Sequence, residues 1–174
     1  MSTFLDLVKK RYSVRCYQDT PVEESLLLKI LETASLAPSA CNNQPCSCVV
    51  IRDNLGKQLL RPAYNRDWFI GAPVIIGVCV DVSSAWRRID GVSYGFVDAA
   101  IVMDHIILAA TELGLGTCWI GAFKTDEAKT ALHLPDNLEP VAFTPLGYAK
   151  HPMTSKTRKP LEQTVCWEKF SLKP

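Results

Sequence analysis

Two arginines four positions apart, with a serine between them, lie near the start of the chain. Arg11, Ser13 and Arg15 belong to the stretch KRYSVRCY, which directly follows the first apolar helical positions. Guanidinium groups and a hydroxyl can bind a phosphate through charge-assisted hydrogen bonds. A solvated helix end carries the same residue types, so this motif alone is a weak indication of a phosphate site.

A second basic group, KTRKP, lies far downstream at Lys156 to Pro160. It belongs to a polar tail, where lysine and arginine are ordinarily solvated. The formal net charge of the whole chain is only +1, so charge gives no general preference for nucleic acid or for an anionic membrane. A phosphate site would therefore be local, and it would require the two basic groups to meet in space.

Other residue types that often carry chemistry form no recognisable site. The seven cysteines include no C-x-x-C pair, and the three histidines lack metal-ligand spacing. The segment GLGTCWIG departs from the dinucleotide-binding fingerprint in its last spacing, and it leads into a strand instead of a helix. We predict a reduced, cytoplasmic protein without a metal, in which the cysteines mainly pack.

Two closely spaced cysteines were considered as joint ligands. We expect Cys46 and Cys48 to point to opposite faces of an extended segment, so that they could not hold a metal together. Whether these thiols, or that of Cys41, take part in redox chemistry stays open at the level of the sequence.

Periodicity and capping signals predict the helices that must position these residues. A first helix is predicted over residues 3–11, with its apolar side chains facing inward. A second is predicted over 20–37, where Thr20 and Glu23 form a capping box and Pro21 takes the first helical position. Thr125 is predicted to cap a short helix. The inward-facing residues of the first helix are Phe4, Leu5, Leu7 and Val8.

Short apolar segments predict the strands. The run APVIIGVCV is too short to cross a bilayer, and within it residues 73–80 predict a strand that is buried on both faces. Further strands are predicted at 48–52, 117–121 and 141–149. The order of the elements predicts a single domain, residues 1–174, built as a mixed α/β sandwich.

The helix predicted over residues 96–114 is apolar around almost its whole circumference. Such a helix needs cover on every side, and we expect a second subunit to cover part of it. From Lys150 onward the chain is polar and basic and then contains TVCWEKF. We expect this extended arm, residues 150–174, to dock on its own core or on a neighbouring subunit.

Seven segments, in their order along the chain, resemble the FMN-dependent nitroreductase family. They are RYSVR, APSACNNQP, APVIIGVCV, DAAIVMDHIILAA, ELGLGTCWIGAF, PLGYA and KTRKP, and together they span nearly the whole chain. The resemblance implies an α+β fold, a three-layer α-β-α sandwich around a mixed central sheet. It also implies an intertwined homodimer, with the arm docked on the partner subunit.

The resemblance implies roles for four groups of residues. In the family, the first motif grips the phosphate and the pyrimidine side of FMN, and the late K-x-R returns to the phosphate. The P-S-x-x-N-x-Q-P motif lies against the flavin of the other subunit, and the W-I-G stretch offers backbone N–H groups to the flavin N5 and O4 edge. The matching residues here are Arg11, Tyr12, Ser13 and Arg15; Lys156 and Arg158; Pro38, Ser39, Ala40, Asn42 and Gln44; and Trp119, Ile120, Gly121 and Ala122.

The chain also departs from the family pattern. Cys46 stands where many members have an aromatic residue, and Ala40 stands where a second serine often follows. Larger members carry an insertion that caps the flavin, for which this chain has little room. We therefore expect the segment YNRDWF, residues 64–69, to form the wall over the ring, with Trp68 and Phe69 contacting the substrate. Ordinary core packing stays the alternative for Trp68, and Asn65 aligns with a flavin-contacting asparagine.

The implied activity is that of an FMN-dependent NAD(P)H oxidoreductase with two alternating half-reactions. NADH or NADPH would be the electron donor, and small nitroaromatic or quinone-like molecules would be the acceptors. No catalytic side chain is implied, because the flavin itself carries the hydride chemistry. Two alternatives stay open, namely a flavin enzyme of the same fold with dehalogenating or flavin-cleaving chemistry, and a flavin-binding module without turnover.

Overall fold

Strand β2 (Val74–Asp81) lies inside the sheet, and its residues from Val74 to Val80 are all buried. Strands β1 (Cys46–Ile51) and β4 (Leu138–Gly147) pair with it on either side, and β3 (Gly116–Thr117) pairs with β4. The computed structural model describes residues 3–152 and 156–171, so parts of the predicted arm, residues 153–155 and 172–174, lie outside the described residues. The burial of β2 confirms the strand that was predicted to be covered on both faces.

The strand pairs of this sheet, in the order β1-β2-β4-β3, are antiparallel. Within the described residues, the parallel contact is an isolated bridge between Ser13 and Thr117. The predicted mixed sheet is therefore antiparallel except at this bridge, which ties the RYSVR segment to the end of the sheet.

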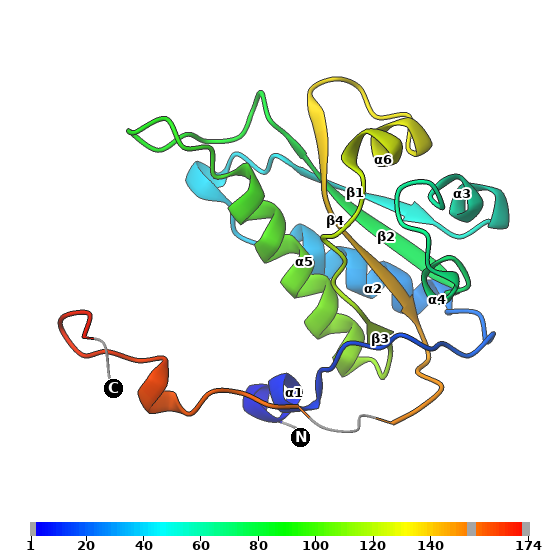
Figure 1. The fold of residues 1–174 in the computed structure, drawn as a ribbon, viewed down its shortest axis with the longest axis horizontal. Helices are drawn as coiled ribbons and strands as arrows, with labels where there is room; N and C mark the ends of the chain where they lie inside the picture. The colour runs from blue at the N-terminus through cyan, green and yellow to red at the C-terminus, as the bar shows by residue number, and fades with distance from the viewer. Residues whose placement is uncertain (1–2, 153–155, 172–174) are drawn as a thin grey trace.

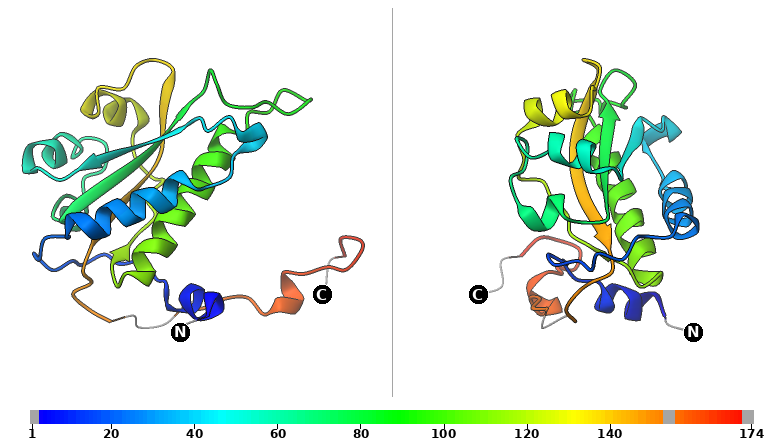
Figure 2. Two further views of the ribbon diagram at one scale, coloured as in Figure 1. Left: turned by 180° about the vertical axis from the view of Figure 1, so that it is seen from behind. Right: turned by 90° about the vertical axis from the view of Figure 1, so that its right-hand side faces the viewer.

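Helices cover both faces of the sheet (Figure 1; the right-hand view of Figure 2 looks along it). Val74, Ile76 and Val78 of β2 pack against α2 (Glu24–Ser35) and α5 (Gly95–Glu112). Ile75 points the other way, as alternation along a strand requires, and it joins a second core cluster with the short helices. These helices are α3 (Asn54–Leu59), α4 (Asp67–Ile70) and α6 (Thr125–Ala131).

The second helix begins later than predicted. Helix α2 starts at Glu24 with Glu23 as its N-cap, and the predicted capping box between Thr20 and Glu23 is not formed. Val22 lies in the extended segment before the helix, where its side chain is buried in the main core. Burial of this side chain explains why the chain stays extended through Pro21. Similarly, Thr125 is the first residue of α6 and not its cap.

Helix α1 (Phe4–Lys10) forms with a capping box between Thr3 and Asp6, but its apolar residues are not buried by this chain. Phe4 is 70% exposed and Leu5 is 60% exposed, so the prediction that they face inward is wrong for the single chain. Such side chains ordinarily mark a surface that contacts another molecule when they occur together.

The C-terminal arm leaves the body of the molecule beside α1 and continues away from it (Figures 1 and 2). It contains one 3₁₀ turn, Leu161–Gln163. Its large apolar side chains are exposed, Trp167 by 77% and Phe170 by 84%. None of the helices in the described residues combines the length and the apolar character needed to cross a membrane.

Gly116 in β3 allows the RYSVR segment to approach the sheet. A Cβ placed at Gly116 would lie 2.5 Å from Cγ2 of Val14. We expect Gly116→Ala to destabilise the apoprotein by about 1–3 kcal/mol, since this contact is too short to be relieved without moving the backbone. Urea unfolding of the apoprotein measures the change.

The matched control is Gly121→Ala, because a Cβ at Gly121 would come no closer than 3.8 Å to non-neighbouring atoms. Equal unfolding midpoints for the two variants would contradict the argument from the Val14 contact.

Candidate functional site

The RYSVR and W-I-G segments lie side by side. The backbone N–H of Val14 donates to the carbonyl of Thr117 over 2.8 Å, next to the Ser13–Thr117 bridge. Burial raises the pKa of Cys118, and the charges of Arg15 and Arg11 partly offset this effect. Both arginines therefore lie close to the start of the segment that leads to Gly121.

The second basic group reaches the same place. The Lys156 ammonium donates to the carbonyl oxygens of Val8, over 2.6 Å, and of Arg11, over 3.0 Å. Desolvation lowers the pKa of Lys156, and the charges of Arg11 and Arg158 lower it further. The two basic groups, 145 positions apart, thus meet in space, as a joint phosphate site requires.

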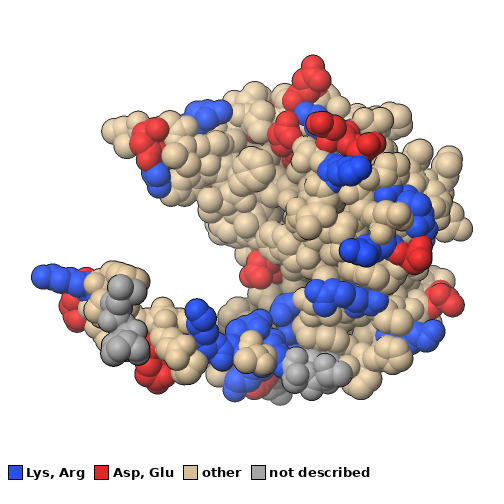
Figure 3. Space-filling model, in the orientation of Figure 1, with Lys and Arg blue, Asp and Glu red and all other residues tan. Residues whose placement is uncertain are grey.

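We call Arg11, Arg15, Lys156 and Arg158 the cation cluster. It has no acidic partner in the part of the chain that the structure describes. The ion pairs there are Arg61–Asp67, Arg88–Asp90 and Lys129–Glu139, and none of them includes a residue of the cluster. Lysine and arginine side chains gather over α1 and the start of the arm (Figure 3). Like charges held together without a counter-charge favour binding of an anion.

The W-I-G segment presents open backbone. Gly121 and Ala122 are exposed, and the described residues offer no acceptor to the N–H group of either one. Packing within the chain does not explain the glycine at position 121, because a side chain would fit there. These two N–H groups can donate to an oxygen or nitrogen of a bound molecule.

The neighbouring residues differ in what they can offer. Trp119 is 42% exposed, whereas the side chain of Ile120 is buried. The N–H and the carbonyl of Ile120 both pair with Phe143, over 2.8 and 3.0 Å. Ile120 therefore cannot donate its N–H to a ligand, and the implied role of its N–H is wrong. The predicted strand at 117–121 is reduced to β3 and this bridge.

The loop that carries the P-S-x-x-N-x-Q-P motif has unusual backbone angles. Cys41, Asn42 and Gln44 have positive φ values of 51°, 55° and 51°. Residues other than glycine adopt this conformation at a cost, and such strain concentrates at functional sites. Hydrogen bonds hold the loop, among them those from the Ala40 N–H to Asp98 Oδ1 (3.0 Å) and from the Gln44 N–H to Ser39 Oγ (2.9 Å).

This loop lies at one end of α5 and the cation cluster lies at the other. Asp98, which holds the loop, is in the first turn of the helix. Thr111, in the last turn, lines a cavity of about 280 Å³ together with Arg11. Asp98 and Thr111 are 13 residues apart along the helix, so the two places are separated by about 20 Å. Within one chain the loop does not reach the cations.

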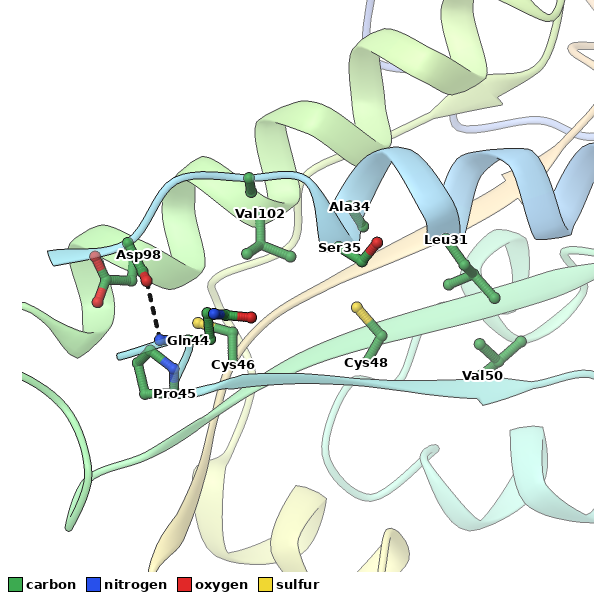
Figure 4. A pocket seen from close by; sticks show the side chains of 12 residues that line it. Leu31, Ala34, Ser35, Gln44, Pro45, Cys46, Cys48, Val50, Asp98 and Val102 are labelled. Atoms are coloured by element: carbon green, nitrogen blue, oxygen red, sulfur yellow. Dashed lines mark hydrogen bonds between the residues drawn. The ribbon is translucent and has the colours of Figure 1, made fainter. Parts of the chain in front are cut away.

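A cavity of about 400 Å³ lies between the loop, β1 and the helices α2 and α5. In Figure 4 the side chains of Cys46, Cys48 and Val50 point from β1 into this cavity. The two cysteines therefore share one face of the strand, and the prediction of opposite faces is wrong. Residues two positions apart on a strand point the same way. Among the described residues no group of three or more potential ligands could hold a metal.

The surroundings of Cys46 disfavour ionisation of its thiol. Burial raises the pKa of this thiol to about 12, and the Asp98 carboxylate contributes to the rise. At pH 8 we expect iodoacetamide to alkylate Cys46 at least about a hundredfold more slowly in the native protein than in the urea-unfolded chain, because the thiolate is the nucleophile. Mass spectrometry of timed digests measures this. Equal rates would show that the thiol ionises as readily in the native protein as in the unfolded chain, and would contradict the raised pKa.

The two residues that were expected to form a substrate wall differ in exposure. Phe69 is 1% exposed and packs against Phe143, so it cannot contact a substrate. Trp68 is half-buried; it packs against Tyr64 and Phe69 and also against the cluster that contains Val14, so it lies beside the RYSVR segment. An aromatic pair next to a loop gives no signal in the sequence that separates a wall from core packing.

Several other predicted residues make local contacts. Asn65 accepts a hydrogen bond from Arg61, and the Tyr12 hydroxyl donates to the carbonyl of His151 over 2.7 Å. Arg158 donates to the carbonyl of Thr157 and remains exposed. The sequence prediction missed Asp98, whose second carboxylate oxygen is buried without a partner in the described residues. An acidic residue in the first turn of an otherwise apolar helix was the available signal.

Comparison with known proteins places this arrangement in a family. The model of the Nitroreductase family matches residues 8–63 and 56–148. A crystal structure of a nitroreductase family protein from Clostridium difficile 630 superimposes with a TM-score of 0.91 at 40% identity, covering 97% of this chain and 99% of that one.

Two curated relatives have names that state an activity. A Thermus thermophilus protein named NADH dehydrogenase is 30% identical over 189 residues, covering 91% of this chain and 92% of its own. A Bacillus subtilis protein named FMN reductase [NAD(P)H] is 30% identical over 167 residues, covering 86% and 67%. With the match of the family model over most of its length, the chain belongs to the nitroreductase family.

Proposed function

We propose that this protein is an FMN-dependent NAD(P)H oxidoreductase that reduces nitroaromatic or quinone-like acceptors and works as a homodimer. The observation that carries the proposal is the cation cluster without an acidic partner among the described residues, joined by the Val14–Thr117 hydrogen bond to the segment with the open N–H groups of Gly121 and Ala122. A phosphate with a flat, hydrogen-bonding ring attached fits both features at once. The names of the two curated relatives support the same class of reaction.

The residues present fit FMN, and each has a role in holding it. Arg11, Ser13, Lys156 and Arg158 would bind the phosphate, whose charge of nearly two matches several cations. Arg15 would lie at the pyrimidine side of the ring, where reduction places negative charge. When bound, FMN supplies the hydride and electron chemistry. The N–H groups of Gly121 and Ala122 would orient the ring.

A second copy of the chain would supply the loop residues that cannot reach the cations of their own chain. The strained loop with Pro38, Ser39, Ala40, Asn42 and Gln44 is held at the first turn of α5, about 20 Å along the helix from the cations of its own chain at the last turn. We infer that it contacts the flavin of the partner subunit. The exposed apolar residues of α1, of α5 and of the arm would be buried in the same dimer, which accounts for their exposure here.

The identity and the reduction of the bound flavin test the proposed function. The purified protein should release FMN, and not FAD, when it is denatured with acid, and NADH or NADPH should bleach its yellow colour anaerobically. An acceptor panel of a nitroarene and a quinone then identifies the second half-reaction. Recovery of FAD would contradict the cofactor proposal, and FMN that neither nucleotide bleaches would make the protein a flavin-binding module.

Gly121→Ala tests the open backbone separately from stability. The added methyl group fits the single chain, since its nearest non-neighbouring atom is 3.8 Å away, so the apoprotein should unfold as the unchanged protein does. We expect FMN to bind about tenfold or more weakly, because the methyl group would stand where the ring approaches the backbone. Titration of the apoprotein with FMN, followed by flavin fluorescence, measures the change. Unchanged affinity would remove Gly121 from the site.

A further inference from the structure

The connection between β2 and α5 forms a hairpin that projects from the body of the molecule. We call residues 86–94 the hairpin. It is the green loop at the upper left of Figure 1, and in Figure 3 it stands on the far side of a wide hollow from the arm. The Tyr94 N–H donates to the carbonyl of Trp86, and the Arg88 N–H donates to that of Val92, both over 2.9 Å.

Side chains stiffen this hairpin. The Arg88 guanidinium forms a bidentate ion pair with Asp90 and lies 5.9 Å from the centre of the Tyr94 ring. The rings of Trp86 and Tyr94 meet edge to face with centroids 5.1 Å apart. At the tip, the side chain of Ile89 is fully exposed. A single exposed apolar residue is ordinary on a protein surface, but here an ordered scaffold holds it away from the body.

The base of the hairpin is fixed to the strained loop. The Asn43 amide donates to the carbonyl of Ser84 over 3.0 Å. At the other side of the base, a Cβ on Gly95 would lie 2.7 Å from Val80 and 2.9 Å from Ala85, so the helix start and the base are in close contact. The hairpin therefore begins directly next to the strained loop.

We propose that the hairpin of one subunit forms the wall of the acceptor site on the flavin of the other, with Ile89 contacting an aromatic acceptor. This inference rests on the proposed function, in which the strained loop lies against the partner's flavin. It also gives the site a wall, which Phe69 does not provide because it is buried in the core. Ile89 selects among acceptors and takes no part in the electron transfer.

The first test compares acceptors of different polarity. We expect Ile89→Ala to raise KM for menadione roughly five- to twentyfold and to leave kcat nearly unchanged, because part of an apolar contact is lost. KM for ferricyanide, a polar ion, should not change. The affinity for benzoate, measured by perturbation of the flavin absorbance without turnover, should fall by a similar factor. Leu55→Ala is the control, since Leu55 is 73% exposed on α3, on the opposite face of the sheet.

The second test asks which subunit supplies the hairpin. Heterodimers are prepared in which one chain carries Arg11→Ala and Arg15→Ala, so that only the other chain holds FMN. Placing Ile89→Ala on the chain without FMN should weaken benzoate binding to the single flavin. Placing it on the chain with FMN should have no effect.

The outcomes are distinguishable from failure of the proposed function. Protein that holds no FMN, or FMN that no nicotinamide nucleotide reduces, overturns the proposed function. An active FMN-loaded dimer in which Ile89→Ala changes neither KM for menadione nor benzoate affinity overturns the role of the hairpin alone. An effect from the FMN-holding chain would place the wall in the same subunit and overturn the proposal of a shared site.

Discussion

Replacement of Arg15 by alanine should weaken FMN retention about ten- to hundredfold and make the midpoint potential of the bound flavin more negative. Arg15 is exposed in the single chain, lies near Cys118, and takes part in no ion pair among the described residues. Loss of a charge-assisted hydrogen bond to a ligand costs about 1.5–3 kcal/mol. Equilibrium dialysis measures the retention, and spectroelectrochemistry measures the potential.

Two variants make this result specific. Arg158→Ala should weaken FMN retention and leave the potential nearly unchanged, since this residue is assigned to the phosphate, away from the ring. Arg61→Ala removes an exposed ion pair with Asp67, formed over 2.8 Å, and should change stability by less than about 1 kcal/mol and FMN retention not at all. If Arg15→Ala and Arg158→Ala both retain FMN and the normal potential, the phosphate site proposed for RYSVR and KTR does not exist.

Replacement of Trp167 and Phe170 together by alanine should convert the FMN-loaded homodimer into a monomer that loses FMN. Both side chains are largely exposed in the single chain and belong to an arm that continues away from its own body (Figure 2). Burial of each against a partner would contribute about 1.5–3 kcal/mol. The dissociation constant of the dimer should therefore rise about 10²- to 10⁴-fold.

Sedimentation velocity at low micromolar concentration, read at the flavin and the protein absorbance, measures both losses at once. Lys169→Ala, between the two aromatic positions, is the matched control and should leave the dimer intact. A stable monomer of the unchanged protein that holds FMN would contradict the dimer and, with it, the assignment of the strained loop to the partner's flavin.

The parts of the fold that the sequence predicts well are those in which burial alone decides the structure. The run from Val74 to Val80 has no polar side chain, and only a position inside a sheet between two layers of helices can cover it. The long apolar helix, α5, follows from the same argument. The start of α2 was wrong because a capping pattern is local, whereas burial of Val22 depends on the rest of the core.

In the candidate site, too, the features that the sequence alone did not predict are those that depend on distant parts of the chain. The contact between Lys156 and the backbone of Arg11 could be anticipated only through the family resemblance, since neither basic group carries a sequence signal for contact with the other. That both backbone groups of Ile120 are occupied by Phe143 depends on strand register, which a motif does not contain. The strain at Cys41, Asn42 and Gln44 was likewise invisible, because none of these residues is a glycine.

Helix α5 also limits where residues can be inserted or deleted in this protein. The strained loop is held at its first turn and the cation cluster lies at its last, so both halves of a shared site move with this one helix. Inserting one residue would shift one end by about 1.5 Å and rotate it by about 100°. Homologous chains should therefore differ in length between β2 and α5 or in the arm, while the number of residues within α5 stays constant.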